Sequence, residues 1–210
     1  RNTEGGLKLS EVCEFVGTGR TPARKNYAEE GNFLVKVGNL SGAGIKWEAR
    51  DRNFITDSEV LKRKNSKKPL LLKWGDILLT SSAHSPVYIA KKSDIYTGAP
   101  KFIGSKHISF VGEVMLVRPK LKRISPYLLL AFFRSKDTVN QIQNMVRGQT
   151  AHLHSADLSQ LVIPDEVFEE NSKYKIVANI LEKQAELSEE MNLLISEQIR
   201  ILDSNSPEIL

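Results

Sequence analysis

The stretches of this chain that could do nucleotide chemistry are two glycine-bearing loops. The span Gly98–Lys106 shares some residues with the phosphate-binding loop motif, but it ends in Gly-Ser-Lys where that motif requires Gly-Lys-Ser or Gly-Lys-Thr. The span Gly17–Pro22 opens like a dinucleotide-binding turn, but it lacks the third glycine and ends in proline. Neither loop therefore predicts nucleotide binding.

Metal and nucleophile chemistry is equally poorly supported by the sequence. His152 and His154 would share one face of a strand, but Asp157 is the one local carboxylate, so we expect no metal site. The single cysteine, Cys13, lies in an apolar run, which indicates a buried side chain. The chain has no Gly-x-Ser-x-Gly, no His-Glu-x-x-His and no Asn/Asp-Pro-Pro-Tyr/Phe motif. We expect no catalytic residue and no cofactor bound by this chain.

Charge is divided unequally along the 210 residues. Residues 1–165 carry 26 Lys and Arg against 15 Asp and Glu, whereas residues 166–210 carry 4 against 10. A basic body indicates binding to nucleic acid, although a lysine-rich solvated surface would have the same composition. No apolar run approaches the roughly 18 residues of a spanning helix, so we expect no membrane segment. With one cysteine and no apolar leader, we expect a cytoplasmic protein.

The apolar pattern predicts an α+β or mixed α/β body that ends near residue 165. Short runs bounded by glycine or proline indicate strands, which we place at Phe33–Val37, Asp76–Ser82, Val87–Ala90 and Gln160–Pro164. Residues 7–16 favour a strand or a short helix. The runs His107–Phe110 and Val114–Arg118 favour a hairpin about Gly112. We expect residues 41–68, which are polar, to form loops around short elements.

Helical periodicity replaces this pattern from residue 125 onward. Ser125 can cap a helix whose first turn accommodates Pro126, and a second helix is predicted at Asp137–Arg147, before Gly148. From Lys173 the sequence has neither glycine nor proline until Pro207, which predicts a helix of roughly 46 Å over residues 173–203.

The long helix has a heptad seam, with apolar or amide side chains spaced alternately three and four apart. The seam consists of Val177, Ile180, Gln184, Leu187, Met191, Leu194, Gln198 and Ile201. This stripe predicts pairing with another long helix. The alternative is a terminal helix folded back on its own domain.

Four segments of the chain, taken in order, resemble the DNA specificity (S) subunits of type I restriction-modification systems. They are FVGTGRTPARKNY followed by GNFLVKVGNL within Phe15–Leu40, LLLKWGDILLTSSAHSP at Leu70–Pro86, ISPYLLLAFFRS at Ile124–Ser135 and VRGQTAHLHSADLSQLVIP at Val146–Pro164. The acidic helix stands where that family has its spacer helix, so the resemblance covers residues 5–203. Two features depart from the family's pattern. The helix opens with the sequence KYKIVANIL, and the chain is shorter than full S subunits, which have two target-recognition domains and two spacer helices.

The resemblance implies a division of labour along the chain. Residues 1–165 would be a target-recognition domain, 166–172 a linker, 173–203 a spacer and dimerisation helix, and 204–210 a tail. The helix would pair as an antiparallel coiled coil with a second copy or a second specificity module, so that two readers bind the two halves of a bipartite target. The implied partners are double-stranded DNA, methyltransferase (modification) subunits that bind S-adenosylmethionine, and a restriction subunit.

The DNA contacts implied for the body fall into two groups. Phosphate contacts, which give affinity without sequence information, are expected from Arg20, Arg24, Lys25, Lys62, Lys64, Lys101 and Arg147. Base contacts are expected from loop donors and acceptors, namely Arg20, Thr21, Lys36, Asn39, Ser81, Ser82, His84, Gln149, Thr150 and His152. Thr21 and Asn39 have an alternative role as turn residues, and the run from Lys62 to Lys68 could be a solvated loop.

Two other functions remain open at the sequence level. The chain begins with Arg1 rather than Met, so we expect it to be trimmed or cut from something larger, and it could be the specificity segment of a fused restriction-methylation polypeptide. Alternatively, the basic body could bind an acidic protein while the helix dimerises, which would make the chain a scaffold that does not bind DNA.

Overall fold

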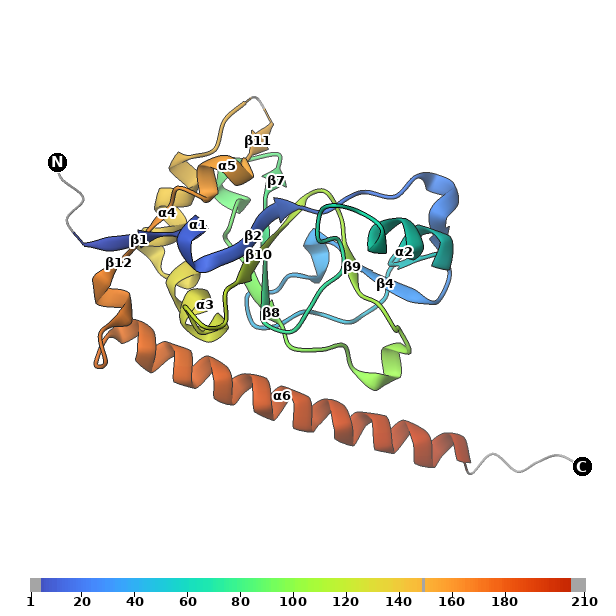
Figure 1. Cartoon of the computed structure of the whole chain (residues 1–210). Coiled ribbons are helices and arrows are strands. Elements are labelled where there is room, and N and C mark those ends of the chain that lie inside the picture. The colour runs from blue at the N-terminus through green and yellow to red at the C-terminus, as the bar shows by residue number, and fades with distance from the viewer. Residues whose placement is uncertain (1–4, 149, 205–210) are drawn as a thin grey trace, which may run out of the picture.

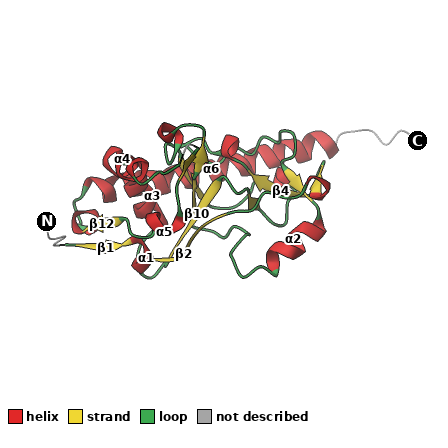
Figure 2. Ribbon diagram, turned by 90° about the horizontal axis from the view of Figure 1, so that it is seen from above, coloured by secondary structure: helices red, strands yellow, loops and turns green. Residues whose placement is uncertain are grey.

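The computed structural model describes residues 5–148 and 150–204 (Figure 1). A mixed α/β body is followed by one long helix, α6 (Lys173–Ser204), which runs along one side of the body. Figure 2, turned by 90°, shows the same arrangement, with α6 and α2 (Asp57–Lys64) on different sides of the body. In the described residues, no helix is long and apolar enough to cross a membrane.

A four-stranded antiparallel sheet forms the centre of the body. Its order is β2 (Cys13–Thr18), β10 (Val114–Pro119), β6 (Asp76–Thr80) and β8 (Ser93–Tyr96). Every residue of β6 and β10 is buried, because both faces of these strands are covered. Their near-continuous apolar sequences are typical of such strands.

The remaining strands form a second sheet and two short pairs. The second sheet has the order β3 (Tyr27–Ala28), β5 (Phe54–Ile55), β4 (Asn32–Val35) and β9 (Ser109–Phe110), and β4 and β9 are parallel. The pairs are β1 (Gly6–Lys8) with β12 (Val162–Pro164), and β7 (Ser82–Ala83) with β11 (Ala151–His152).

Short helices and turns connect these strands. The α-helices before α6 are α1 (Leu9–Val12), α2, α3 (Pro126–Arg134), α4 (Lys136–Asn144) and α5 (Ser155–Leu158). The 3-10 turns are η1 (Arg24–Asn26), η2 (Val37–Asn39), η3 (Pro86–Tyr88), η4 (Lys101–Ile103) and η5 (Asp165–Phe168).

The two faces of the central sheet belong to two different cores. Ile77 and Leu79 of β6 pack with the core that includes α3, whereas Leu78, between them, packs with the core of the second sheet. This alternation follows from the two-residue repeat of a strand. The helix α3 is buried along its length and begins as the sequence predicts, because Ser125 Oγ accepts a hydrogen bond from the Tyr127 N–H at 3.2 Å.

The long helix α6 lies partly on its own body. Tyr174, Ala178 and Leu181 are buried, and α6 packs on α3. They form a stripe separate from the heptad seam. The seam residues are exposed along the helix, with Leu187 53% and Met191 57% exposed. The predicted long helix is confirmed. It rests on its own domain by one face while the seam points outward.

Two sequence predictions are wrong in detail, and a third, of loops around short elements at residues 41–68, becomes more specific. Residues 87–90 are not a strand, because Pro86 starts the 3-10 turn η3 and Ala90 has a positive φ of 51° that ends extended backbone; the strand is β8 instead. Residues 107–118 are not a hairpin, because β9 pairs with β4 while β10 pairs with β2 and β6. The polar stretch 41–68 contains the eight-residue helix α2, whose Thr56 cap accepts from the Glu59 N–H.

Candidate nucleic-acid interface

Three loops from distant parts of the sequence are hydrogen-bonded one to the next, and two of them contact a short segment that we call the junction, residues 111–113. Thr21 Oγ1 donates to Glu113 Oε2 at 3.2 Å and accepts from the Gly112 N–H at 3.3 Å. On the other side, the Ser81 N–H donates to the Glu113 carbonyl at 2.9 Å. The loop after β2 and the end of β6 are therefore attached to the same segment.

The loop after β2 can approach the junction because residue 19 has no side chain. The Gly19 N–H donates to the Val114 carbonyl at 3.0 Å, and the Arg20 N–H donates to the Phe110 carbonyl at 3.2 Å. A Cβ on Gly19 would lie closer than 3.0 Å to the carbonyl oxygens of Phe110 and Val111. Contact between the two backbones therefore requires glycine at this position.

The third loop joins through the β7–β11 pair. His152 lies opposite Ser82, and the Ser82 Oγ and His152 Nδ1 atoms are 2.8 Å apart; which of the two donates depends on the imidazole tautomer. The Leu153 N–H donates to the Ser81 carbonyl at 2.8 Å. Arg147 pairs through its backbone with His152, which places Arg147 next to the β7–β11 pair.

A buried carboxylate connects the loop after β2 to helix α2. Glu59 accepts from Arg20 Nη2 at 2.9 Å, from Arg63 Nε at 3.0 Å and from Asn26 Nδ2 at 2.8 Å. Burial alone would raise the pKa of Glu59, but the hydrogen bonds and charges of the two arginines outweigh it and hold that pKa below its ordinary value. Arg63 also donates to the Arg20 carbonyl at 2.7 Å, so the loop is held at two points.

Four of the predicted phosphate contacts lie on this connected unit. Arg24 and Lys25 are exposed in η1, and Lys62 and Lys64 are exposed on α2. Figure 1 shows the residue 20–28 segment, in blue, beside α2 at one end of the body. Arg20 is 43% exposed in its side chain but is already paired with Glu59, so it can offer DNA only part of its guanidinium.

Other predicted contacts lie around the β7–β11 pair. Thr150 and His84 are exposed, and the His84 ring packs on the Tyr88 ring at 4.8 Å. Arg147 is exposed and forms an ion pair with Asp157 at 3.2 Å. Gln149 lies outside the described residues. Thr21, Ser82, Thr150 and His152 are thus brought together by the structure, although they come from three separate motifs.

Two predicted base contacts are inside the domain. Asn39 is 4% exposed; its side-chain oxygen accepts from the Lys36 N–H and its amide nitrogen donates to the Lys46 carbonyl, so it organises a turn. Ser81 is fully buried, and its Oγ has no hydrogen-bond partner in the part of the chain that the structure describes. Neither side chain can contact a base in this conformation, and we remove both from the proposed surface.

Two other predicted basic contacts have different surroundings. Lys36 Nζ donates to the Asp51 carbonyl at 2.7 Å and lies 5.8 Å from the Tyr27 ring centroid, and burial lowers its pKa. Lys101 lies in η4, which contacts α6. It therefore belongs to the helix side of the body, and we remove it from the proposed surface.

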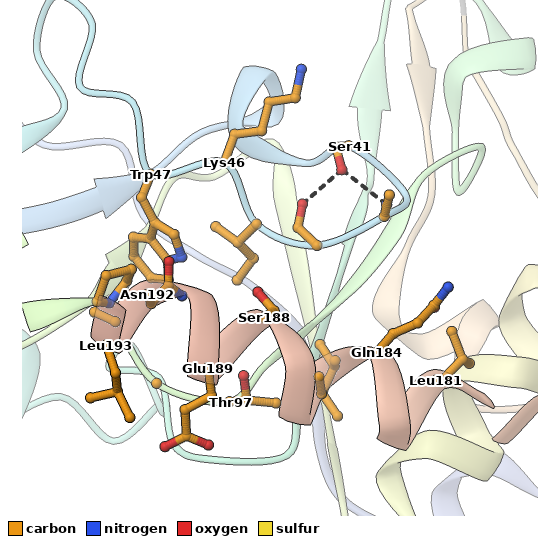
Figure 3. Close-up of a pocket in the computed structure, with 18 of the residues that line it drawn as sticks. Ser41, Lys46, Trp47, Thr97, Leu181, Gln184, Ser188, Glu189, Asn192 and Leu193 are labelled. Atoms are coloured by element: carbon orange, nitrogen blue, oxygen red, sulfur yellow. Dashed lines mark hydrogen bonds between the residues drawn. The ribbon is translucent and has the colours of Figure 1, made fainter. Parts of the chain in front are cut away.

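A groove of about 450 Å³ separates α6 from the loops at residues 41–47 and 97–101 (Figure 3). Gln184, Ser188 and Asn192 line its helix wall, and Trp47 lines the opposite wall. Lys101 is also part of the lining. This hollow is separate from the junction and shares none of the residues that meet there.

Sequence reasoning missed Glu113 and helix α2. Glu113 was missed because the expected DNA contacts were basic, amide, hydroxyl and imidazole side chains, with no carboxylate among them. Helix α2 had a detectable signal, since Thr56 and Glu59 have the Thr-x-x-Glu spacing of a capping box. In the described part of the chain, no three His, Cys, Asp or Glu residues form a group that could hold a metal ion.

Solved structures with a similar fold come from restriction-modification systems. The type I S subunit from M. genitalium matches with a TM-score of 0.54 at 11% identity, over 97% of this chain and 45% of that chain. The chain has the fold of a type I specificity subunit. A structure from work on type I complex assembly and conformational transition matches with a TM-score of 0.54 at 12% identity, over 96% of this chain and 44% of that chain.

The specificity-subunit fold also occurs within a larger enzyme. The type IIG restriction endonuclease BpuSI matches with a TM-score of 0.52 at 11% identity, over 85% of this chain and 26% of that chain. This chain thus spans less than half the length of each of these three structures. No family model and no curated protein sequence matches it.

Proposed function

We propose that this chain is a DNA-recognition module of a type I restriction-modification system and that it reads one half of a bipartite target. The hydrogen bonds that connect the three loops beside the junction support this proposal most strongly. Base reading requires several donors and acceptors held in a fixed arrangement. Thr21, Ser82, Thr150 and His152 supply such groups on backbone segments that are hydrogen-bonded to one another.

The charges around this surface favour a duplex as the ligand. Arg24, Lys25, Lys62 and Lys64 are exposed, and the hydrogen bond from Asn26 of η1 to Glu59 of α2 attaches their two elements to each other. Cations fixed beside hydrogen-bonding loops can bind phosphates and thereby align the loops with the base edges. In this proposal the basic residues supply affinity and the junction supplies sequence preference.

The long helix would set the distance between two such readers. Its exposed seam offers pairing, as an antiparallel coiled coil, to a second copy or to a second specificity module. A 32-residue helix is roughly 48 Å long, enough to separate readers by about one turn of DNA, 34–36 Å. Methyl transfer would come from modification subunits that bind S-adenosylmethionine, with a restriction subunit completing the complex; this chain would contribute recognition and no catalysis.

A second candidate is the specificity segment of a fused restriction-methylation polypeptide. The match to 26% of the type IIG endonuclease favours it, because there a similar fold is one part of a larger enzyme. The surface that reads DNA would be the same. A parent gene that encodes a methyltransferase in frame would identify this form.

The proposal predicts salt-dependent binding of the 210-residue chain to duplex DNA of random sequence. Log affinity should fall linearly with log salt, because each contacted phosphate releases counterions. Replacing Lys62 by Ala should reduce the slope by about 0.9, the value for one phosphate contact. The matched control, Lys101→Ala, should leave the slope unchanged, since Lys101 lies beside α6. Absence of binding, or binding without a slope, would favour the protein scaffold instead.

A further inference from the structure

Glu113 is an exposed carboxylate at the centre of a surface proposed to bind a polyanion. Two other carboxylates beside these loops are paired with cations: Glu59 with Arg20 and Arg63, and Asp157 with Arg147. Glu113 instead accepts a hydrogen bond from the neutral hydroxyl of Thr21. Within the described residues no cation forms an ion pair with Glu113, although its charge interacts with that of Lys36, so the carboxylate should repel phosphates that approach it.

The backbone on both sides of this carboxylate is fixed. The Val111 N–H donates to the Val35 carbonyl at 3.1 Å, and the Glu113 carbonyl accepts from the Ser81 N–H at 2.9 Å. The Thr21 hydroxyl bonds to Glu113 Oε2, and among the described residues no hydrogen bond to Oε1 is formed, so this oxygen can accept one from a ligand. A side chain held in this way presents a hydrogen-bond acceptor in a defined direction and loses little conformational freedom on binding.

The hydrogen-bonding groups on the base edges determine which base a carboxylate can bind in the major groove. Cytosine presents the N4 amino donor in the major groove, and a carboxylate is the side chain that accepts from it. Adenine presents a donor next to the N7 acceptor, a pair that suits an amide rather than a carboxylate. Guanine presents two acceptors at this edge and thymine presents one, and each would repel the charge.

We propose that Glu113 is a specificity-determining residue that selects a cytosine in the half-site through its N4 amino group. This inference rests on the proposed function, because it needs the junction to face the major groove. It adds to that function an element of discrimination by repulsion: the carboxylate penalises any base edge that offers only acceptors. Thr21 is then a positioning residue, which acts through the orientation of Glu113.

The test begins with selection of binding sites from a pool of random duplexes by the wild-type 210-residue chain. The selected half-site should contain an invariant cytosine, and changing that C·G pair to T·A should weaken binding roughly 10- to 100-fold. In Glu113→Gln the same change should cost less than about threefold, because an amide can donate to thymine O4. Thr21→Val should partly relax the preference at the same base pair, because it removes the hydroxyl that orients Glu113.

Glu14→Gln is the matched control, since Glu14 is exposed on β2 and loses the same charge. It should keep the wild-type preference at every position, and thermal unfolding of each variant checks that it is folded. Three results would overturn the role of Glu113 while leaving the proposed function intact. They are an unchanged base preference in folded Glu113→Gln, a wild-type site without cytosine, and a Glu113→Gln variant that loses affinity equally for changes at all positions. A wild-type chain that selects no sequence would overturn the proposed function and this inference with it.

Discussion

At the scale of single residues, the interface depends on one backbone contact. Gly19 allows the loop after β2 to reach Phe110 and Val111, and that contact places Thr21 beside Glu113. The Thr21 hydroxyl is used twice, as donor to the carboxylate and as acceptor from Gly112. A change that separates the two backbones should therefore lose both hydrogen bonds at once.

Replacing Gly19 by Ala tests this contact. The added methyl would lie closer than 3.0 Å to two carbonyl oxygens, so we expect the free energy of unfolding to fall by about 1–3 kcal/mol, as for other overpacked sites. Sequence preference should fall more than affinity for random duplex. Gly38→Ala is the control, because among the described residues other than Gly38 and its two chain neighbours no heavy atom lies within 4 Å of the added Cβ, so stability should change by less than about 0.5 kcal/mol. Equal behaviour of the two variants in denaturant unfolding and site selection would contradict the account.

At the scale of elements, α6 presents two stripes with different environments. Tyr174, Ala178 and Leu181 are buried against the body, whereas Leu187, Met191 and Leu194 are more than half exposed. An apolar stripe that long on a water-exposed helix is typical of an interaction surface. The inner stripe accounts for the position of the helix on the body, and the outer stripe is the surface that we propose for a partner helix.

The outer stripe predicts concentration-dependent self-association. Leu187→Glu should shift the chain toward monomer, because it puts a charge into the centre of the seam, and analytical ultracentrifugation would measure the shift. Leu193→Glu is the same change on the groove side of the helix, where Leu193 lines the hollow with Trp47, and it should leave self-association intact. A wild-type chain that stays monomeric at all concentrations, or equal effects of both variants, would argue against pairing through the seam.

At the scale of the whole molecule, the sequence predicts the elements better than the surface they build. The long helix, the Ser125–Pro126 start of α3 and the strand β6 follow from local periodicity and capping. The site depends on pairs far apart in sequence, with Thr21 and Glu113 separated by 92 residues and Ser82 and His152 by 70. Local spacing contains no information on such pairs. The family resemblance indicated loops that the structure brings close together, but the burial of Asn39 and Ser81 could be seen only in the structure.

The distribution of charge over the surface can be seen only in the whole molecule. The exposed cations of η1 and α2 lie at one end of the body, and the acidic helix α6 runs along a different side (Figures 1 and 2). DNA should therefore bind the loop side and be repelled from the helix side. The position of DNA on the body is thus the central claim.

Site-specific photo-crosslinking to duplex DNA tests that claim most directly. Single cysteines at Thr150 and Ser188, two exposed hydroxyl residues on the loop and helix sides, would each be labelled with a photoreactive group. The native Cys13 should not interfere, because burial raises the pKa of its thiol to about 12. The account predicts that the label at residue 150 crosslinks to DNA and the label at residue 188 does not. Crosslinking at residue 188 alone, or equally at both positions, would contradict it.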